Sequence, residues 1–148
     1  MGNRQADIDF TFQLPTTVRA LLDVLTPAGW AAEERLGRIS YMINDADDMY
    51  EWYDNAPDRL DAVLAELDST ANLPYSVALN IYHAQGRTGG MLVFSAQRRE
   101  VSFLPTINRR RIPDAPKFTD LAWYLHALVP SLLWAGLEGY EAREDPND

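Results

Sequence analysis

Residues 75–104 read YSVALNIYHAQGRTGGMLVFSAQRREVSFL, and this segment determines the fold class. Apolar and polar residues alternate in YSVALNIYHA (75–84), which is typical of a half-buried strand. QGRTGG (85–90) has turn chemistry, and residues 90–96 and 99–104 supply two further strands. The connections are far too short for a crossover, so we expect these three strands to pair as an antiparallel meander.

Strand and helix patterns alternate in the residues before and after the meander. We expect strands at 7–14 and 38–43, helices at about 18–25, 56–68 and 120–134, and a short last strand within GLEGYEARE (136–144). Thr16 or Thr17 is expected to cap the first helix, Asn55 the second and Thr119 the third, because these side chains accept hydrogen bonds from free amide groups.

The resulting order is β-α-β-α-β-β-β-α with an optional closing strand. Helices covering one face of a mostly antiparallel sheet of five or six strands make a two-layer α+β sandwich. With 148 residues and no visible linker, the chain is expected to form a single domain over residues 1–148. We expect residues 1–5 and 145–148 to fray.

Composition excludes several classes of function. The net charge of −9 disfavours binding to nucleic acid or to an anionic membrane, because both would repel the chain. The absence of cysteine excludes disulfides, thiolate metal sites and cysteine nucleophiles. The first ten residues, MGNRQADIDF, lack the apolar core of a secretory signal, and no apolar run reaches the length of a membrane span. We therefore expect a cytoplasmic protein.

An acidic-aromatic segment, YMINDADDMYEWYDN (41–55), separates the second predicted strand from the second helix. Its carboxylates are Asp45, Asp47, Asp48, Glu51 and Asp54, and its central aromatic residues are Tyr50, Trp52 and Tyr53. It is not an EF-hand loop, which needs glycine at the sixth position and glutamate at the twelfth. Three interpretations stay open: a magnesium site on two carboxylates, a solvated loop whose aromatics cover the sheet edge, or a recognition surface for a basic protein.

Charge is unevenly distributed along the chain. Residues 41–72 contain nine acids and one base, whereas residues 87–117 contain seven bases and two acids. The basic part includes three adjacent arginines, Arg109, Arg110 and Arg111, which are candidates for contact with an anion or a partner because guanidinium groups match phosphate and carboxylate geometry. The alternative is that these arginines pair with the acids inside the fold.

The last predicted helix carries two tryptophans, Trp123 and Trp134, eleven residues apart. At 100° per residue they return to nearly the same side of the helix, which predicts either an apolar stripe for self-association as a homodimer or a helix buried on most sides.

No arrangement of residues indicates catalysis or a bound metal or cofactor. The two histidines, His83 and His126, are 43 positions apart, which is not a metal-ligand spacing. Ser95 and Ser102 lie in strand patterns without a G-x-S-x-G motif, so a serine nucleophile is not indicated. We expect both histidines to be structural, and no catalytic residue, metal ligand or cofactor is predicted.

Small size, acidity, lack of cysteine, the α+β order and the segment DADDMYEWYD together resemble the immunity proteins of bacterial toxin systems. Those proteins neutralise a cognate, usually basic, toxin domain by capping its active site. The resemblance implies a non-catalytic module that binds a basic protein, with the carboxylates of the acidic-aromatic segment in the electropositive cleft and Tyr50, Trp52 and Tyr53 as apolar anchors. The competing hypotheses are a small ligand-binding or enzymatic domain with an arginine-lined anionic pocket, and a structural homodimer.

Overall fold

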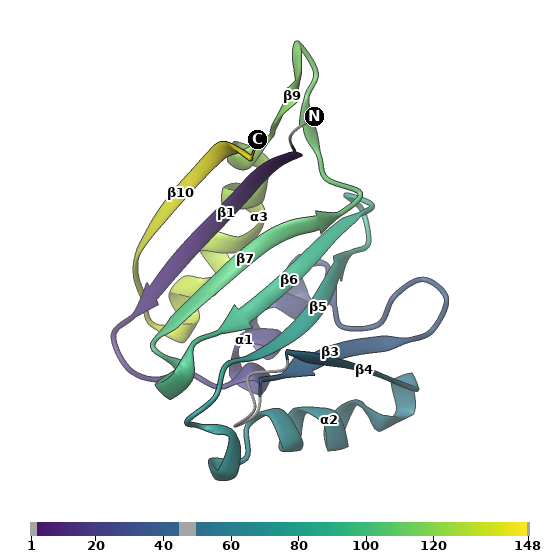
Figure 1. Cartoon of the computed structure of the whole chain (residues 1–148), viewed down its shortest axis with the longest axis vertical. Helices are drawn as coiled ribbons and strands as arrows, with labels where there is room; N and C mark the ends of the chain where they lie inside the picture. Colours follow the sequence, from purple (N-terminus) through teal and green to yellow (C-terminus); the bar gives the residue numbers. More distant parts are fainter. Residues whose placement is uncertain (1–2, 45–49, 148) are drawn as a thin grey trace.

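Helices lie on one face of an antiparallel sheet, as the alternation in the sequence predicts (Figure 1). The computed structural model describes residues 3–44 and 50–147 of the chain. These residues contain three α-helices and an eight-stranded sheet in which every strand pair is antiparallel. The predicted α+β class is therefore confirmed.

The strands of the main sheet are β1 (Asn3–Phe12), β2 (Trp30–Ala31), β3 (Ile39–Ile43), β4 (Glu51–Asn55), β5 (Val77–His83), β6 (Thr88–Phe94), β7 (Glu100–Ile107) and β10 (Leu137–Asn147). Their order is β10-β1-β7-β6-β5-β3-β4, with β2 paired to β5. The predicted meander is present as β5, β6 and β7. A separate hairpin of β8 (Arg111–Ile112) and β9 (Ala115–Thr119) projects from one end of the molecule (Figure 1).

The sheet is larger than the five or six strands predicted. The short strands β2, β8 and β9 and the edge strand β4 were not predicted. Residues 1–5 and 145–148 were expected to fray; in their described part Asn3 pairs with Asn147 and Gln5 with Asp145. The long backbone ladder between β1 and β10 holds both ends of the chain together.

The helices are α1 (Val18–Leu25), α2 (Leu60–Leu67) and α3 (Leu121–Leu132), and no helix in the described part of the chain is long and apolar enough to cross a membrane. Thr17 caps α1 as predicted, since its hydroxyl accepts a hydrogen bond from the Ala20 amide at 3.0 Å. The Asp68 carboxylate adds a second cap by accepting bonds from the amides of Val18 (2.7 Å) and Arg19 (3.1 Å). The end of α2 thus holds the beginning of α1.

Two predicted helix caps are wrong. Asn55 is the last residue of β4, and its side chain accepts a bond only from the adjacent Ala56 amide, while a 3₁₀ turn leads into α2. Thr119 belongs to β9, and Asp120 takes the capping role by accepting a bond from the Trp123 amide at 3.2 Å. In both cases the predicted residue is the last residue of a strand, and the helix begins only after further residues that are not in the strand.

The core lies between the sheet and the helices. Alternate residues of the strands point toward the helices, and Phe10, Leu79 and Phe103 among them have no exposed surface. Leu21 of α1 and Leu128 of α3 close the core from the other layer and are equally buried. Burial of these apolar side chains is the main favourable term in the stability of the fold.

Two adjacent glycines let β6 approach both of its neighbouring strands closely. A Cβ atom on Gly89 would lie 2.4 Å from the carbonyl oxygen of Ile81 in β5. A Cβ atom on Gly90 would lie 2.1 Å from the carbonyl oxygen of Leu104, so no other residue fits there without a backbone shift. The register between β6 and β7 shifts between Gly89 and Met91, and Met91 then pairs with Leu104. Met91 and Leu104 therefore lie side by side on the face of the sheet that points away from the helices.

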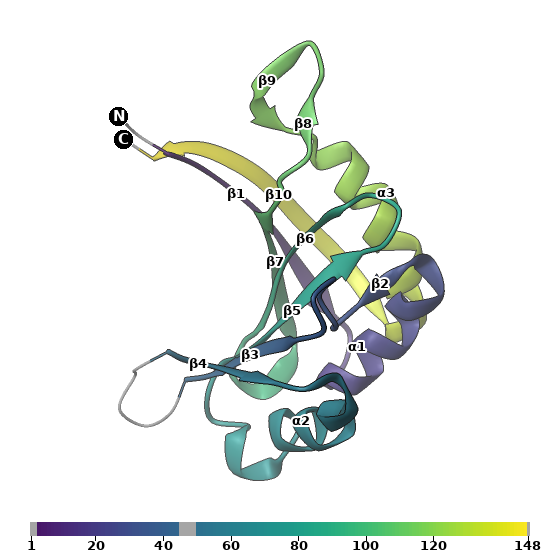
Figure 2. The same ribbon diagram turned by 90° about the vertical axis from the view of Figure 1, so that its right-hand side faces the viewer.

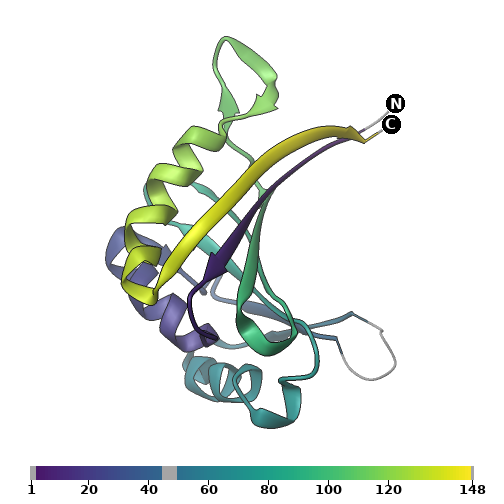
Figure 3. The same cartoon turned by 90° about the vertical axis from the view of Figure 1, so that its left-hand side faces the viewer.

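Within the described residues, no helix packs against that second face of the sheet (Figures 2 and 3). In both views α1 and α3 lie on one side of the sheet, whereas the terminal ends of β1 and β10 and the β3–β4 pair project away on the other side. This uncovered face, called the open face below, is therefore concave.

Candidate functional site

The acidic-aromatic segment contributes to both faces of the sheet. Its last five residues form β4, which pairs with β3 and is the edge strand of the sheet. Successive residues of a strand point to opposite faces. Because Trp52 pairs with Met42 and Asp54 with Ser40, Trp52 and Asp54 lie on the open face, while Tyr53 lies on the face toward the helices.

Asp54 and Trp52 are adjacent positions on the open face of β4. The Ser40 hydroxyl donates a hydrogen bond to Oδ1 of Asp54 at 2.7 Å, and Nη1 of Arg38 lies 3.4 Å from Oδ2. These contacts orient the carboxylate, and its side chain stays 53% exposed. Trp52 is 42% exposed beside it. An oriented, accessible carboxylate next to an accessible indole offers both charge and apolar area to a partner.

The remaining aromatic residues of the segment are positioned differently. Tyr53 stacks on Tyr41 with ring centroids 5.6 Å apart, and its hydroxyl donates to Oε2 of Glu51 at 3.0 Å. Tyr50 is 54% exposed and has a φ of 50°, a left-handed conformation that is uncommon for a non-glycine residue. Its amide donates to Oδ1 of Asn44 at 3.4 Å. Tyr53 and Glu51 therefore support the hairpin from the helix side.

Three of the predicted partner contacts, Asp45, Asp47 and Asp48, lie outside the described residues. The described members of the predicted set are Tyr50, Glu51, Trp52, Tyr53 and Asp54, and all five are exposed. Three neighbouring exposed aromatic residues, two on the edge strand β4 and Tyr50 directly before it, are a feature of interaction sites rather than of an ordinary solvated surface.

The three adjacent arginines do not converge on one site. Nη1 of Arg109 lies 3.3 Å from Oε2 of Glu144, and both side chains are largely buried. The guanidinium group of Arg110 lies over the ring of Trp123, 4.5 Å from its centroid. Arg111 is exposed on the β8–β9 hairpin. Its Nη1 donates a hydrogen bond to the Pro116 carbonyl oxygen at 3.2 Å, so all three guanidinium groups have partners within the fold. Only that of Arg109 is paired with an acid, which is what the alternative interpretation of the charge pattern expected.

His83 lies in an aromatic cluster on the face of the sheet that is covered by the helices. Its Nδ1 accepts a hydrogen bond from the Gly86 amide at 2.8 Å, and its Nε2 lies 3.0 Å from the Ala28 carbonyl oxygen, which assigns the proton to Nε2. Its ring meets those of Trp30 and Trp123 edge-on, with centroids 4.9 and 5.2 Å away. Both ring nitrogens are used by backbone groups, which is a structural role.

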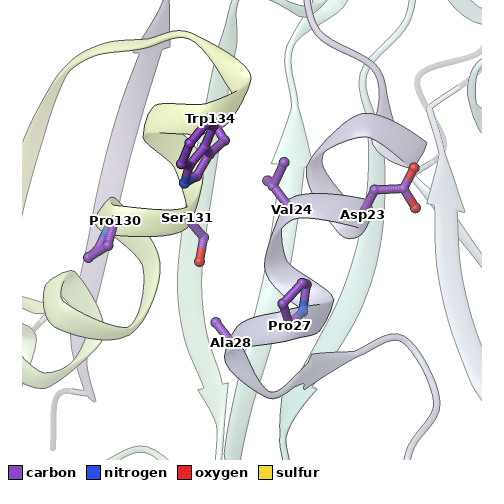
Figure 4. Close-up of a pocket in the computed structure, with 7 residues that line it drawn as sticks. All are labelled: Asp23, Val24, Pro27, Ala28, Pro130, Ser131 and Trp134. Carbon is purple, nitrogen blue, oxygen red and sulfur yellow. The ribbon is translucent and has the colours of Figure 1, made fainter.

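Trp123 and Trp134 do not form a common exposed stripe. Trp123 is half-buried in the cluster around His83, whereas Trp134 is 86% exposed. Trp134 lies at the rim of a groove between α1 and α3 (Figure 4). The groove is lined by Asp23, Val24, Pro27, Ala28, Pro130, Ser131 and Trp134, a set with one carboxylate and no basic side chain. It therefore lacks the arginines expected for an anionic pocket.

A second acidic group on the open face was not identified from the sequence. In β1 and β10, Asp7 lies opposite Arg143, and Asp9 lies opposite Glu141. Arg143 lies 3.3 Å from Asp7 (Nε to Oδ1), 3.3 Å from Glu141 (Nη1 to Oε1) and 3.9 Å from Asp9 (Nη2 to Oδ2). One guanidinium group is shared by three carboxylates, which we call the carboxylate cluster (Asp7, Asp9 and Glu141).

The pKa of Asp7 is raised above the ordinary value of an aspartate. Burial contributes most to this increase, and the negative charge of Asp9 adds to it, while Arg143 acts in the opposite direction. The charged form of Asp7 is therefore less favourable in the folded protein than in the unfolded chain. Charges that reduce stability in this way are often kept where function requires them.

We expect Asp7→Asn to increase the free energy of unfolding at neutral pH. Because the folded-state pKa of Asp7 is above its unfolded value, the folded protein binds more protons between the two values, and the contribution of Asp7 to stability falls as pH rises through this window. The difference in the free energy of unfolding between Asp7→Asn and the wild type should therefore be largest at neutral pH and disappear below about pH 4. Urea unfolding across this pH range measures it, and Glu138→Gln, which removes an exposed carboxylate on β10, is the control. A stability gain that is independent of pH would contradict the prediction.

Within residues 3–44 and 50–147, no three side chains among histidine, aspartate and glutamate are grouped so that they could hold a metal ion.

Comparison of the chain with protein-family models, with curated proteins and with solved structures finds no match in any of the three.

Proposed function

We propose that this chain is a non-catalytic, cytoplasmic protein-binding module that neutralises a basic protein by capping it, as the immunity proteins of bacterial toxin systems do. The observation that carries the proposal is the edge strand β4, where Trp52 and Asp54 are exposed side by side on the open face. Tryptophan at such a position provides rigid apolar contact area, and tyrosine, tryptophan and arginine dominate the energetics of protein interfaces.

Electrostatics support a basic partner. The net charge of −9 attracts a cationic protein over distances of about 10 Å at moderate salt. Carboxylates at an interface accelerate association and select against acidic competitors, whereas buried aromatic residues determine the lifetime of the complex. In this mechanism Asp54 and its acidic neighbours guide the partner, and Trp52 holds it.

The protein encoded by the adjacent reading frame is the first partner to test, by size exclusion and calorimetry at low and high salt. We expect one-to-one binding that weakens by about tenfold or more between 50 and 500 mM salt, because exposed charges are screened. Light scattering on the free protein separates this function from the homodimer predicted from Trp123 and Trp134. An absence of binding at both salt concentrations would contradict the proposal for this partner.

A further inference from the structure

The strand register places a continuous row of side chains across the open face. From β1 to β4, the paired residues in this row are Asp9, Ser102, Val93, Ala78, Met42 and Trp52. The row begins at the carboxylate cluster, passes through small and apolar side chains, of which Ala78 and Met42 are buried, and ends at the exposed indole. Two features that are far apart in the sequence therefore belong to the same surface.

The centre of the open face is apolar and is not covered by a helix. In the next row, Met91 pairs with Leu104 on one side and with Asn80 on the other. Met91, Leu104 and Val93 are half-buried, so part of each side chain is in contact with water. An apolar centre with charged residues at both ends is the usual composition of a protein–protein interface, in which a polar rim surrounds an apolar core.

The charges at one end of the open face are not balanced within the fold. The carboxylate cluster has three acids for the single Arg143, and Asp54 at the other end pairs with Arg38. Asp9 and Glu141 are direct cross-strand neighbours, an arrangement in which like charges repel. A cationic group placed over this pair would reduce the repulsion. The same charge would be attracted to the face of the Trp52 ring at the opposite end.

We propose that the entire open face, from the carboxylate cluster to Trp52 and Asp54, is a single docking surface for a convex, arginine- and lysine-rich protein surface. The inference rests on the proposed function and extends it from one edge strand to the whole concave face (Figure 2). The curvature selects a convex partner, the carboxylates at both ends select basic side chains, and the strip around Met91 and Val93 accommodates their apolar stems.

Titration of the ¹⁵N-labelled protein with an oligoarginine peptide at low salt tests the location of the surface without a natural partner. We expect the largest amide shifts on the open face, at Asp9, Ser102 and Val93. Asp9→Asn combined with Glu141→Gln should weaken peptide binding by about fivefold or more and leave the fold intact, because it removes a repulsive pair. Asp58→Asn combined with Glu66→Gln changes the net charge equally at exposed positions near α2 and should have little effect. Shifts centred on α2, or equal effects of the two double variants, would overturn the inference.

A second pair of variants tests the apolar centre with the protein from the adjacent reading frame. Met91→Arg places a positive charge in the middle of the open face and should weaken binding by about tenfold or more, whereas Met91→Gln, of similar size, should have a much smaller effect. If Trp52→Ala weakens binding and both Met91 variants bind normally, the extended surface is wrong and the proposed function stands. If wild-type protein does not bind, the proposed function fails for this partner, and the peptide titration still decides where cationic groups dock.

Discussion

Replacing Arg98 by alanine is expected to lower the free energy of unfolding by about 3 kcal/mol or more, since each buried acceptor left without a donor costs about 1–3 kcal/mol. The Arg98 side chain is 2% exposed, and its guanidinium group donates hydrogen bonds to the carbonyl oxygens of Tyr75 (2.7 Å), Ser95 (2.8 Å) and Asn72 (2.8 Å). These bonds join the loop before β5 to the turn after β6. Burial lowers the pKa of the guanidinium group, which shows that burying this charge costs free energy. The three carbonyl bonds offset that cost.

Urea unfolding of the Arg98 variant, analysed for a change in midpoint at constant slope, measures the effect. Arg99→Ala is the matched control, because Arg99 is the adjacent arginine, is exposed, and its guanidinium group makes long contacts of 3.4 Å to the Phe12 carbonyl oxygen. We expect a loss below about 1 kcal/mol for the control. Arg98→Lys should resemble the alanine variant more than the wild type, since an ammonium group lacks the planar fork that spans three carbonyl oxygens. Similar losses for Arg98→Ala and Arg99→Ala would contradict the structural role.

Replacing Trp52 by alanine is expected to weaken binding to the basic partner by about tenfold or more, which corresponds to about 1.4 kcal/mol. Trp52 is exposed on the open face of an edge strand, so its apolar surface is available to a partner. The same position limits the effect on folding, because a side chain that is 42% exposed has less burial to lose than a core tryptophan. Calorimetry or surface-based kinetics should show the change mainly as faster dissociation.

Tyr53→Ala is the matched control for this prediction. Tyr53 is the next residue of the same strand and is similarly exposed, at 39%, but it points toward the helix side and stacks on Tyr41. We expect its removal to change affinity much less than removal of Trp52. Trp52→Phe should retain part of the affinity, because it preserves an aromatic ring at the same place. An unchanged dissociation constant for Trp52→Ala, or a larger effect of Tyr53→Ala, would show that the partner does not use the open face of β4.

The elements that were predicted correctly have one apolar side. The first strand, the meander and the three helices bury one face each, so their apolar residues recur with the period of the element. The strand β4 has no such signal, because its residues 51–54 are exposed on both faces at the edge of the sheet. The same reason explains the last strand, which was expected within residues 136–144 and in the structure continues to Asn147 as the other edge of the sheet.

The candidate site could be predicted only in part. The acidic and aromatic residues from Tyr50 to Asp54 were identified from composition, and the structure places them at an exposed edge. Their division between two faces follows from strand pairing, which a segment without apolar alternation does not specify. The three arginines show the opposite situation. They are adjacent in the chain, yet Arg109 and Arg110 contact Glu144 and Trp123, because successive residues of an extended backbone point in different directions.

Local patterns in the chain were therefore sufficient for the α+β class, the order of the main elements, the excess of negative charge and the segment most suited to recognition. The tertiary structure alone decided that Asp9 lies opposite Glu141, that the carboxylate cluster and Trp52 lie on one concave face, and that Trp123 is packed inside while Trp134 is exposed. Periodicity reports which side of an element is apolar. Which elements become neighbours depends on long-range strand pairing and packing, and these are properties of the assembled core.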